Sequence, residues 1–210
     1  MSLPPSADPV LVSDTRKNRV FLYEDRVLKT FKPVRSSARR ARRELVALRL
    51  LAGLEGVPVV IESGVNRMTV VLSRVPGKPL SECESVAEHT MVSLRQLVEK
   101  MLERGIARHS LPPRDVLVAL DGSAGLVDFE RSTRRRFRGD PGWLVAKAVT
   151  RFHLTRLIHK HAPQLLTPSE HRRLRWQVLL RAALQHPAEL KRRVIRAFFR
   201  RRTPPCPRGS

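Results

Sequence analysis

The segment from residue 104 to residue 132, RGIARHSLPPRDVLVALDGSAGLVDFERS, constrains the fold more than any other part of the chain. Gly105 marks the end of a preceding helix, and a short loop rich in proline and charge follows it. Two apolar runs come next, over 116–120 and 125–129, and the Asp-Gly pair between them predicts a β-hairpin. The segment therefore predicts a helix, a tight loop and a hairpin that closes on an acidic residue, Asp128.

The preceding part of the chain predicts a small sheet with one helix. Strands are predicted over 20–23 and 26–31, joined by a Glu-Asp turn, because these runs are rich in β-branched and aromatic residues. A helix is predicted from Ser36 or Ser37 to about residue 52, since Ala41, Leu45, Leu48 and Leu51 fall on one face. Two more strands are predicted over 57–64 and 68–75.

The rest of the chain predicts mostly helices. They are expected over 85–104, 142–161, 168–185 and 187–202, with Trp143 and Trp176 as core anchors and Asp140 as a helix cap. The resulting fold class is α+β, with a small sheet-plus-helix lobe followed by a mostly helical lobe. The expected domains are a tail at 1–9, a small lobe at 10–75, a helical lobe at 76–186, and a basic helix with a tail at 187–210.

Positive charge is concentrated near the C-terminus. The chain of 210 residues has a formal net charge of +22, and residues 131–210 hold 21 Lys and Arg against 3 Asp and Glu. Such a field attracts anionic lipid, nucleic acid or phosphorylated substrates.

Two cysteines without metal-site spacing favour a reducing compartment. The first residues lack a secretory signal and there is no apolar run of 18 residues, so the expected location is cytoplasmic.

The segment KRRVIRAFFRRR, residues 191–202, has a cationic rim and an apolar stripe. One interpretation is a peripheral membrane anchor on the inner face of the plasma membrane. An equally weighted alternative is a terminal helix that packs on its own domain. Nucleic-acid binding also stays open, although aromatic residues make up only 5% of the chain and no binding module is evident.

In this order of elements and in certain residues, the chain resembles the protein-kinase-like superfamily, and most of all the small bacterial lipopolysaccharide kinases that phosphorylate heptose or Kdo. The resemblance covers about residues 10–160. It implies that Lys29 in RVLKTF contacts the α- and β-phosphates of ATP and that Glu44 clamps this lysine. It also implies that Asp128 binds Mg²⁺ and that the backbone near Arg74 and Val75 hydrogen-bonds the adenine base.

The loop before the hairpin departs from the family pattern. Ser110 falls where the family has its general-base Asp, and Arg108 replaces the first His of the loop. Asp115 falls on the second metal-binding Asn, so the resemblance implies that Asp115 holds Mg²⁺ together with Asp128. A serine cannot accept a proton at neutral pH, so His109 is a possible substitute base. The segment LVSDTRKNRVFLY, where kinases cover the phosphates with glycines, contains none, and Arg16, Lys17 and Arg19 offer side-chain contacts instead.

The resemblance implies an ATP- and Mg²⁺-dependent phosphotransferase, expected as a monomer, that acts on a lipid A–core sugar hydroxyl or on a protein hydroxyl. Two alternatives remain. The first is a pseudokinase, a regulatory module that keeps the fold and has lost turnover. The second is a basic nucleic-acid-binding protein whose kinase-like segment is coincidental.

Overall fold

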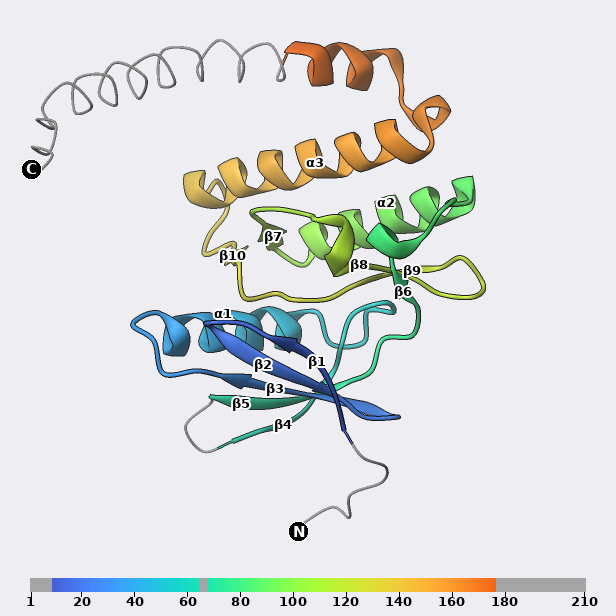
Figure 1. Ribbon diagram of the computed structural model, residues 1–210. Helices are drawn as coiled ribbons and strands as arrows, with labels where there is room; N and C mark the ends of the chain where they lie inside the picture. Colours follow the sequence, from blue (N-terminus) through green and yellow to red (C-terminus); the bar gives the residue numbers. More distant parts are fainter. Residues whose placement is uncertain (1–8, 65–67, 177–210) are drawn as a thin grey trace, which may run out of the picture. The chain divides into compact units, whose positions relative to one another are not determined.

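The computed structural model describes residues 9–64 and 68–176, and they fall into two compact units (Figure 1). The first unit extends to Leu165 and the second begins at Leu166. The expected domain boundary near residue 186 and the expected basic helix at 191–202 lie outside the described residues.

The small lobe is a five-stranded antiparallel sheet in the order β1-β2-β3-β5-β4. Its strands are β1 (Val10–Asp14), β2 (Asn18–Leu22), β3 (Arg26–Phe31), β4 (Val60–Ser63) and β5 (Thr69–Ser73). β3 is central, between β2 and β5, so a side chain on it is shielded on both sides.

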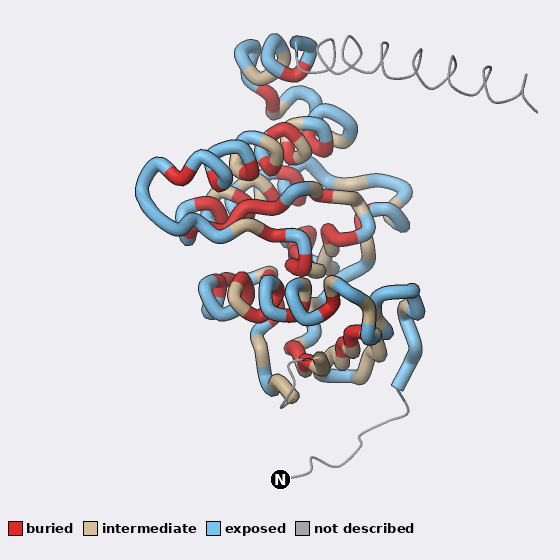
Figure 2. The backbone as a smooth tube through the Cα atoms, turned by 90° about the vertical axis from the view of Figure 1, so that its left-hand side faces the viewer, coloured by how far each residue is buried: buried red, intermediate tan, exposed pale blue. Residues whose placement is uncertain are grey.

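The one helix of this lobe, α1 (Ser37–Leu50), follows β3. Ala41, Glu44, Leu45 and Leu48 are buried, which is the spacing of a single helical face. In Figure 2, buried and exposed positions alternate along this helix. The predicted serine cap is only partly present: Ser36 occupies the N-cap position without a capping bond, and the Ser37 hydroxyl donates to the Lys32 carbonyl.

The helical lobe is built on α2 (Glu88–Glu103) and α3 (Pro141–His161). Between them lie β7 (Ile106–Arg108), the 3-10 turn η2 (Pro113–Asp115), β8 (Val116–Val118), β9 (Ala124–Leu126) and β10 (Ser132–Arg134). β8 and β9 pair as the predicted hairpin, β6 (Lys78–Pro79) adds to β8, and β7 pairs with β10. Two further 3-10 turns are η1 (Leu80–Glu82) and η3 (Pro163–Leu165).

Local signals explain where the helices of this lobe begin and end. Gly105 follows α2 with a φ of 78°, the left-handed conformation that ends a helix. The Asp140 carboxylate accepts a hydrogen bond from the Trp143 backbone at 3.3 Å, as predicted for a cap of α3. Within the described residues no helix is both long enough and apolar enough to cross a membrane.

Three expectations need correction. α2 begins at Glu88 rather than residue 85, and the hairpin strands are shorter than the apolar runs that predicted them. Trp143 is buried as predicted, but Trp176 is 67% exposed, so the prediction of a second core tryptophan is wrong. Trp176 lies on a helix that begins at Pro168, where Thr167 and Glu170 exchange capping bonds, and this helix turns the indole toward solvent.

The loop after α1 joins the small lobe to the hairpin of the helical lobe. The Leu126 amide donates to the Gly56 carbonyl at 2.7 Å. A Cβ on Gly56 would lie 2.5 Å from the Ala124 carbonyl oxygen, so only glycine allows this approach. The hairpin is therefore held against the loop after α1, and the segment after β9 reaches β3, where Asp128 contacts Lys29.

Candidate active site

Lys29 lies at the centre of a buried ionic cluster. Its ammonium group is 2.8 Å from a Glu44 carboxylate oxygen and 2.8 Å from Asp128 Oδ1. The three residues come from β3, α1 and the segment that follows β9. The structure thus brings together three residues that the sequence separates by up to 99 positions.

Burial and charge oppose each other in this cluster. Burial lowers the pKa of Lys29, but the Glu44 and Asp128 carboxylates outweigh it, so the pKa lies above its usual value and the lysine stays charged. Burial raises the pKa of Glu44 despite the nearby ammonium. Burial also acts to raise the pKa of Asp128, yet Lys29 outweighs that effect and holds it below the usual range. Asp128 is accordingly a carboxylate at neutral pH.

Asp128 has an unusual backbone conformation. Its φ is 64°, the only positive value at a non-glycine position among the described residues. Asp tolerates this left-handed region better than most residues, and such conformations concentrate at functional sites. The side chain is 40% exposed, so one carboxylate oxygen can bind Lys29 while the carboxylate remains accessible from solvent. This accessibility is what a metal ligand requires.

The loop before the hairpin presents Ser110 and His109 differently. Ser110 is half-buried, and its hydroxyl has no hydrogen-bond partner among the described residues. The His109 ring lies with Nε2 2.8 Å from the Thr133 hydroxyl on β10. Partial burial, together with the charges of Arg43 and Arg131, lowers the pKa of His109, so the imidazole is neutral at pH 7. A neutral imidazole can accept a proton, and His109 lies exposed at the surface of this loop.

Asp115 and Arg108 form a second buried ion pair, which the sequence interpretation missed. Arg108 Nη2 lies 2.6 Å from Asp115 Oδ2, and Arg108 Nη1 donates to the Val127 carbonyl at 2.9 Å. Arg108 is 3% exposed and Asp115 is 8% exposed. Two departures from the family pattern could have indicated this pair. Arg108 replaces the family's His, and Asp115 replaces its Asn, so that a cation and a carboxylate appear together.

Glu130 stands two residues after Asp128, where the kinase pattern has a Gly, and it was not predicted as a site residue. It is buried, and its Oε2 has no hydrogen-bond partner among the described residues. The charge of Glu130 is the last of the causes that raise the pKa of Glu44. The other three acidic residues of the site are paired with cations: Glu44 and Asp128 with Lys29, and Asp115 with Arg108 and Arg114.

The linker between the lobes leaves one backbone donor available. The Ser73 amide donates to the Val59 carbonyl at 2.8 Å, and the Arg74 amide donates to the Asp25 carbonyl at 3.2 Å. The Val75 amide has no acceptor among the described residues. Of the two predicted adenine-binding residues, Val75 is therefore placed to offer an N–H, whereas the Arg74 amide is already used.

The predicted phosphate-covering segment forms a short turn between β1 and β2. The Thr15 hydroxyl closes it by accepting from the Lys17 and Asn18 amides at 3.1 Å. Arg19 is paired with Asp14 at 3.1 Å, while Arg16 and Lys17 are exposed. Because the Thr15 hydroxyl takes up the Lys17 and Asn18 amides, the exposed positive groups of the turn are side chains.

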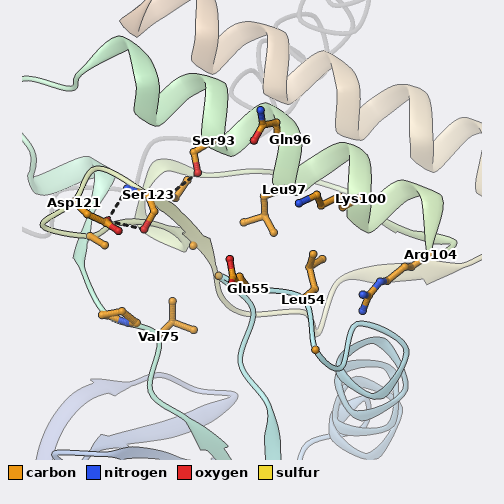
Figure 3. A pocket seen from close by; sticks show the side chains of 16 residues that line it. Leu54, Glu55, Val75, Ser93, Gln96, Leu97, Lys100, Arg104, Asp121 and Ser123 are labelled. Carbon is orange, nitrogen blue, oxygen red and sulfur yellow. Dashed lines mark hydrogen bonds between the residues drawn. The ribbon is translucent and has the colours of Figure 1, made fainter.

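A hollow of about 530 Å³ lies behind the linker (Figure 3). Ser93, Leu97 and Lys100 line it from α2, Arg104 lines it from the end of that helix, and Val75 lines it from the linker. None of the residues of the two ion clusters lines it, but it shares Val75 with the predicted adenine-binding linker.

Comparisons with known proteins agree at the level of fold. No family model matches the chain, and no curated protein matches it. Among solved structures, a 2.2 Å crystal structure of WbdD matches 68% of this chain at 24% identity and a TM-score of 0.51, over 35% of its own length. A structure of monomeric WbdD matches 83% of this chain at 23% identity and a TM-score of 0.53, over 42% of its own length.

The fold is protein-kinase-like. WbdD is described as a bifunctional kinase-methyltransferase, and one matching structure contains the kinase inhibitor LY294002. This chain spans roughly two fifths or less of the WbdD chains. At this identity the likeness establishes the two-lobed architecture that the sequence predicted, and leaves the lipopolysaccharide-kinase family as an expectation.

The kinase-like site has groups that fit a metal–nucleotide complex. Magnesium is usually bound through one or two carboxylates together with substrate phosphates. Asp128 supplies an accessible carboxylate, and no group of three metal-ligating side chains among the described residues forms a complete metal cage. Beside Asp128, Lys29 carries a positive charge of the kind that pairs with phosphate oxygens.

Proposed function

We propose that this protein is an ATP- and Mg²⁺-dependent phosphotransferase. The observation that carries the proposal is the Lys29 ammonium, which lies 2.8 Å from both Glu44 and Asp128 within a kinase-like fold. Removing charged groups from water costs free energy. A buried lysine between two carboxylates from different elements therefore suggests a functional role rather than a role in packing. It suits a site that must position phosphate oxygens and a metal ion.

Each residue has a distinct task in this proposal. ATP supplies the phosphoryl group, and Mg²⁺ neutralises the charge of its phosphates. Lys29 orients the phosphates, Glu44 fixes Lys29, and Asp128 holds the ion. The Val75 amide donates to the adenine base. Ser110 and His109 line the acceptor side. There neutral His109 can take the proton of the acceptor hydroxyl as that oxygen bonds to the γ-phosphorus, while the bond from this phosphorus to the β–γ bridging oxygen breaks and ADP leaves.

The proposed acceptor is a hydroxyl of a lipopolysaccharide core sugar, with a protein hydroxyl as the second choice. The net charge of +22 supports an acidic, phosphorylated acceptor. The proposed location is the cytoplasm, with peripheral contact at the inner face of the plasma membrane through residues 191–202. The protein is proposed to act as a monomer.

A pseudokinase is the second candidate, and the loop favours it. Ser110 cannot replace a carboxylate as a proton acceptor, and the turn between β1 and β2 has no glycine. Such a protein would bind nucleotide or a partner without transferring phosphate.

Substitution of Ser110→Asp separates the two candidates. ATP consumption and transfer of labelled γ-phosphate would be measured for native protein, Ser110→Asp and Asp128→Asn with lipopolysaccharide core acceptors. A working enzyme is expected to turn over in native form, to lose activity in Asp128→Asn, and to change modestly in Ser110→Asp. No native turnover, with activity appearing in Ser110→Asp by about 10²-fold or more above background, would identify a pseudokinase.

A further inference from the structure

Arg108 is held through both its backbone and its side chain. Its amide donates to the Thr150 hydroxyl at 2.8 Å, and its carbonyl accepts from the same hydroxyl at 2.7 Å. Its guanidinium bonds Asp115 and the Val127 carbonyl, and it lies 5.2 Å from the centre of the buried Phe129 ring. A side chain held at so many points and 3% exposed cannot swing into solvent.

The guanidinium lies between the two positions where a kinase-like site would hold metal. On one side it bonds the Asp115 carboxylate, and on the other it bonds the carbonyl of Val127, the residue before Asp128. The Asp115 carbonyl in turn accepts from the Val127 amide at 3.0 Å. Arg108 thus joins the two candidate metal-binding segments and leaves its positive charge between them.

The two aspartates differ in their availability to a metal ion. Asp115 has Oδ2 on Arg108 at 2.6 Å and Oδ1 facing Arg114 at 3.6 Å, and its side chain is 12% exposed. Asp128 has one oxygen on Lys29, and its side chain is 40% exposed. A dication at Asp115 would have to sit beside a permanently charged, immobile guanidinium. At Asp128 the neighbouring cation is an ammonium that would be shared with phosphate.

We infer that Arg108 takes the place of a second metal ion, so that this site binds a single divalent cation through Asp128. Arg108 is a positioning residue: it neutralises Asp115 and fixes the backbone before Asp128. The inference rests on the proposed function, because it concerns the metal of the same nucleotide site. It assigns Asp115 to charge pairing with Arg108 instead of metal binding.

Counting bound Mn²⁺ tests this inference without measuring activity. Free and bound Mn²⁺ would be distinguished by electron paramagnetic resonance during titration of the full chain with a non-hydrolysable ATP analogue. We expect one Mn²⁺ per chain. Asp128→Asn should abolish this binding, Asp115→Asn should change the affinity less than about threefold, and Asp121→Asn, an exposed carboxylate on the hairpin turn, is the matched control. Asp115→Asn and Asp121→Asn should each still bind one Mn²⁺.

Removal of the Arg108 charge should create the second site. Arg108→Gln keeps a hydrogen-bond donor for Asp115 and is expected to raise the count from one Mn²⁺ to two, while Arg108→Gln with Asp115→Ala returns it to one. If Arg108→Gln does not fold, the number of Mn²⁺ bound by the native chain and by Asp115→Asn still tests the inference. Two Mn²⁺ on the native chain, or loss of binding in Asp115→Asn, would overturn the inference alone. No bound Mn²⁺ on the native chain would overturn the proposed function with it.

Discussion

At the scale of single residues, the Lys29–Glu44–Asp128 cluster is the centre of the proposed site. All three residues were named in advance, because the resemblance to kinases implied a role for each. The Arg108–Asp115 pair and buried Glu130 were not predicted, since pairing depends on how β7, η2 and the segment after β9 meet in space. Spacing along the chain can suggest a role for one residue, but it does not give the partner.

Removal of Lys29 alone should destabilise the fold. Lys29→Met leaves the Glu44 carboxylate buried without its partner and is expected to lower the free energy of unfolding by about 3–5 kcal/mol. Lys29→Met with Glu44→Leu should recover most of that loss, because the uncompensated charge is gone. The coupling between Lys29 and Glu44 is measured by urea denaturation of the native protein, of the two single variants and of the double variant. Additive effects in the double variant would show that the pair is not energetically linked.

Asp128 should make stability depend on acid pH in a defined direction. Its pKa in the folded protein is lower than in the unfolded chain because of Lys29, so its contribution is present above pH 3.8 and is lost as the pH falls through the folded pKa. The difference in unfolding free energy between native protein and Asp128→Asn should therefore shrink from pH 6 to pH 3. A difference that stays constant or grows on acidification would contradict this assignment.

At the scale of elements, most helices and strands follow from their sequence. Alternating apolar residues gave β2 and β3, the Ala41–Leu48 face gave α1, and Gly105 gave the end of α2. The exposure of Trp176 did not follow, because a large aromatic residue is buried only if its own helix face meets the protein. The contact between the loop after α1 and the hairpin could not be predicted either, since it depends on two glycines 69 positions apart, Gly56 and Gly125.

A pair of glycine substitutions measures that contact. Gly53 and Gly56 have φ values of 74° and 77°, but a Cβ on Gly53 meets nothing within 4 Å, whereas a Cβ on Gly56 lies 2.5 Å from the Ala124 carbonyl oxygen. Gly53→Ala should cost only the left-handed conformation, about 1–2 kcal/mol. Gly56→Ala should cost at least about 1–3 kcal/mol more, because the backbone of the hairpin must move. Equal losses in thermal denaturation would show that the loop does not press on the hairpin.

At the scale of the whole molecule, the fold is kinase-like, but the charged residues of its loop depart from the family pattern at Arg108, Ser110 and Asp115. The sheet lobe provides Lys29 and Glu44, and the helical lobe provides Asp128, so the cluster forms only when both lobes are in place. The two-lobed α+β fold could be predicted from the order of elements. The acceptor could not, because no motif in the chain describes it. Positive charge near the C-terminus indicates an anionic surface or acceptor and does not select among them.

Calorimetric titration of ATP, with and without Mg²⁺, tests the central claim most directly. The native chain is expected to bind ATP in a Mg²⁺-dependent manner, and Asp128→Asn should remove the Mg²⁺ dependence. Asp121→Asn, an exposed carboxylate outside the cluster, should bind as the native chain does. Absence of binding at millimolar ATP, or binding that is unchanged in Asp128→Asn, would contradict the assignment of this cluster as a nucleotide site.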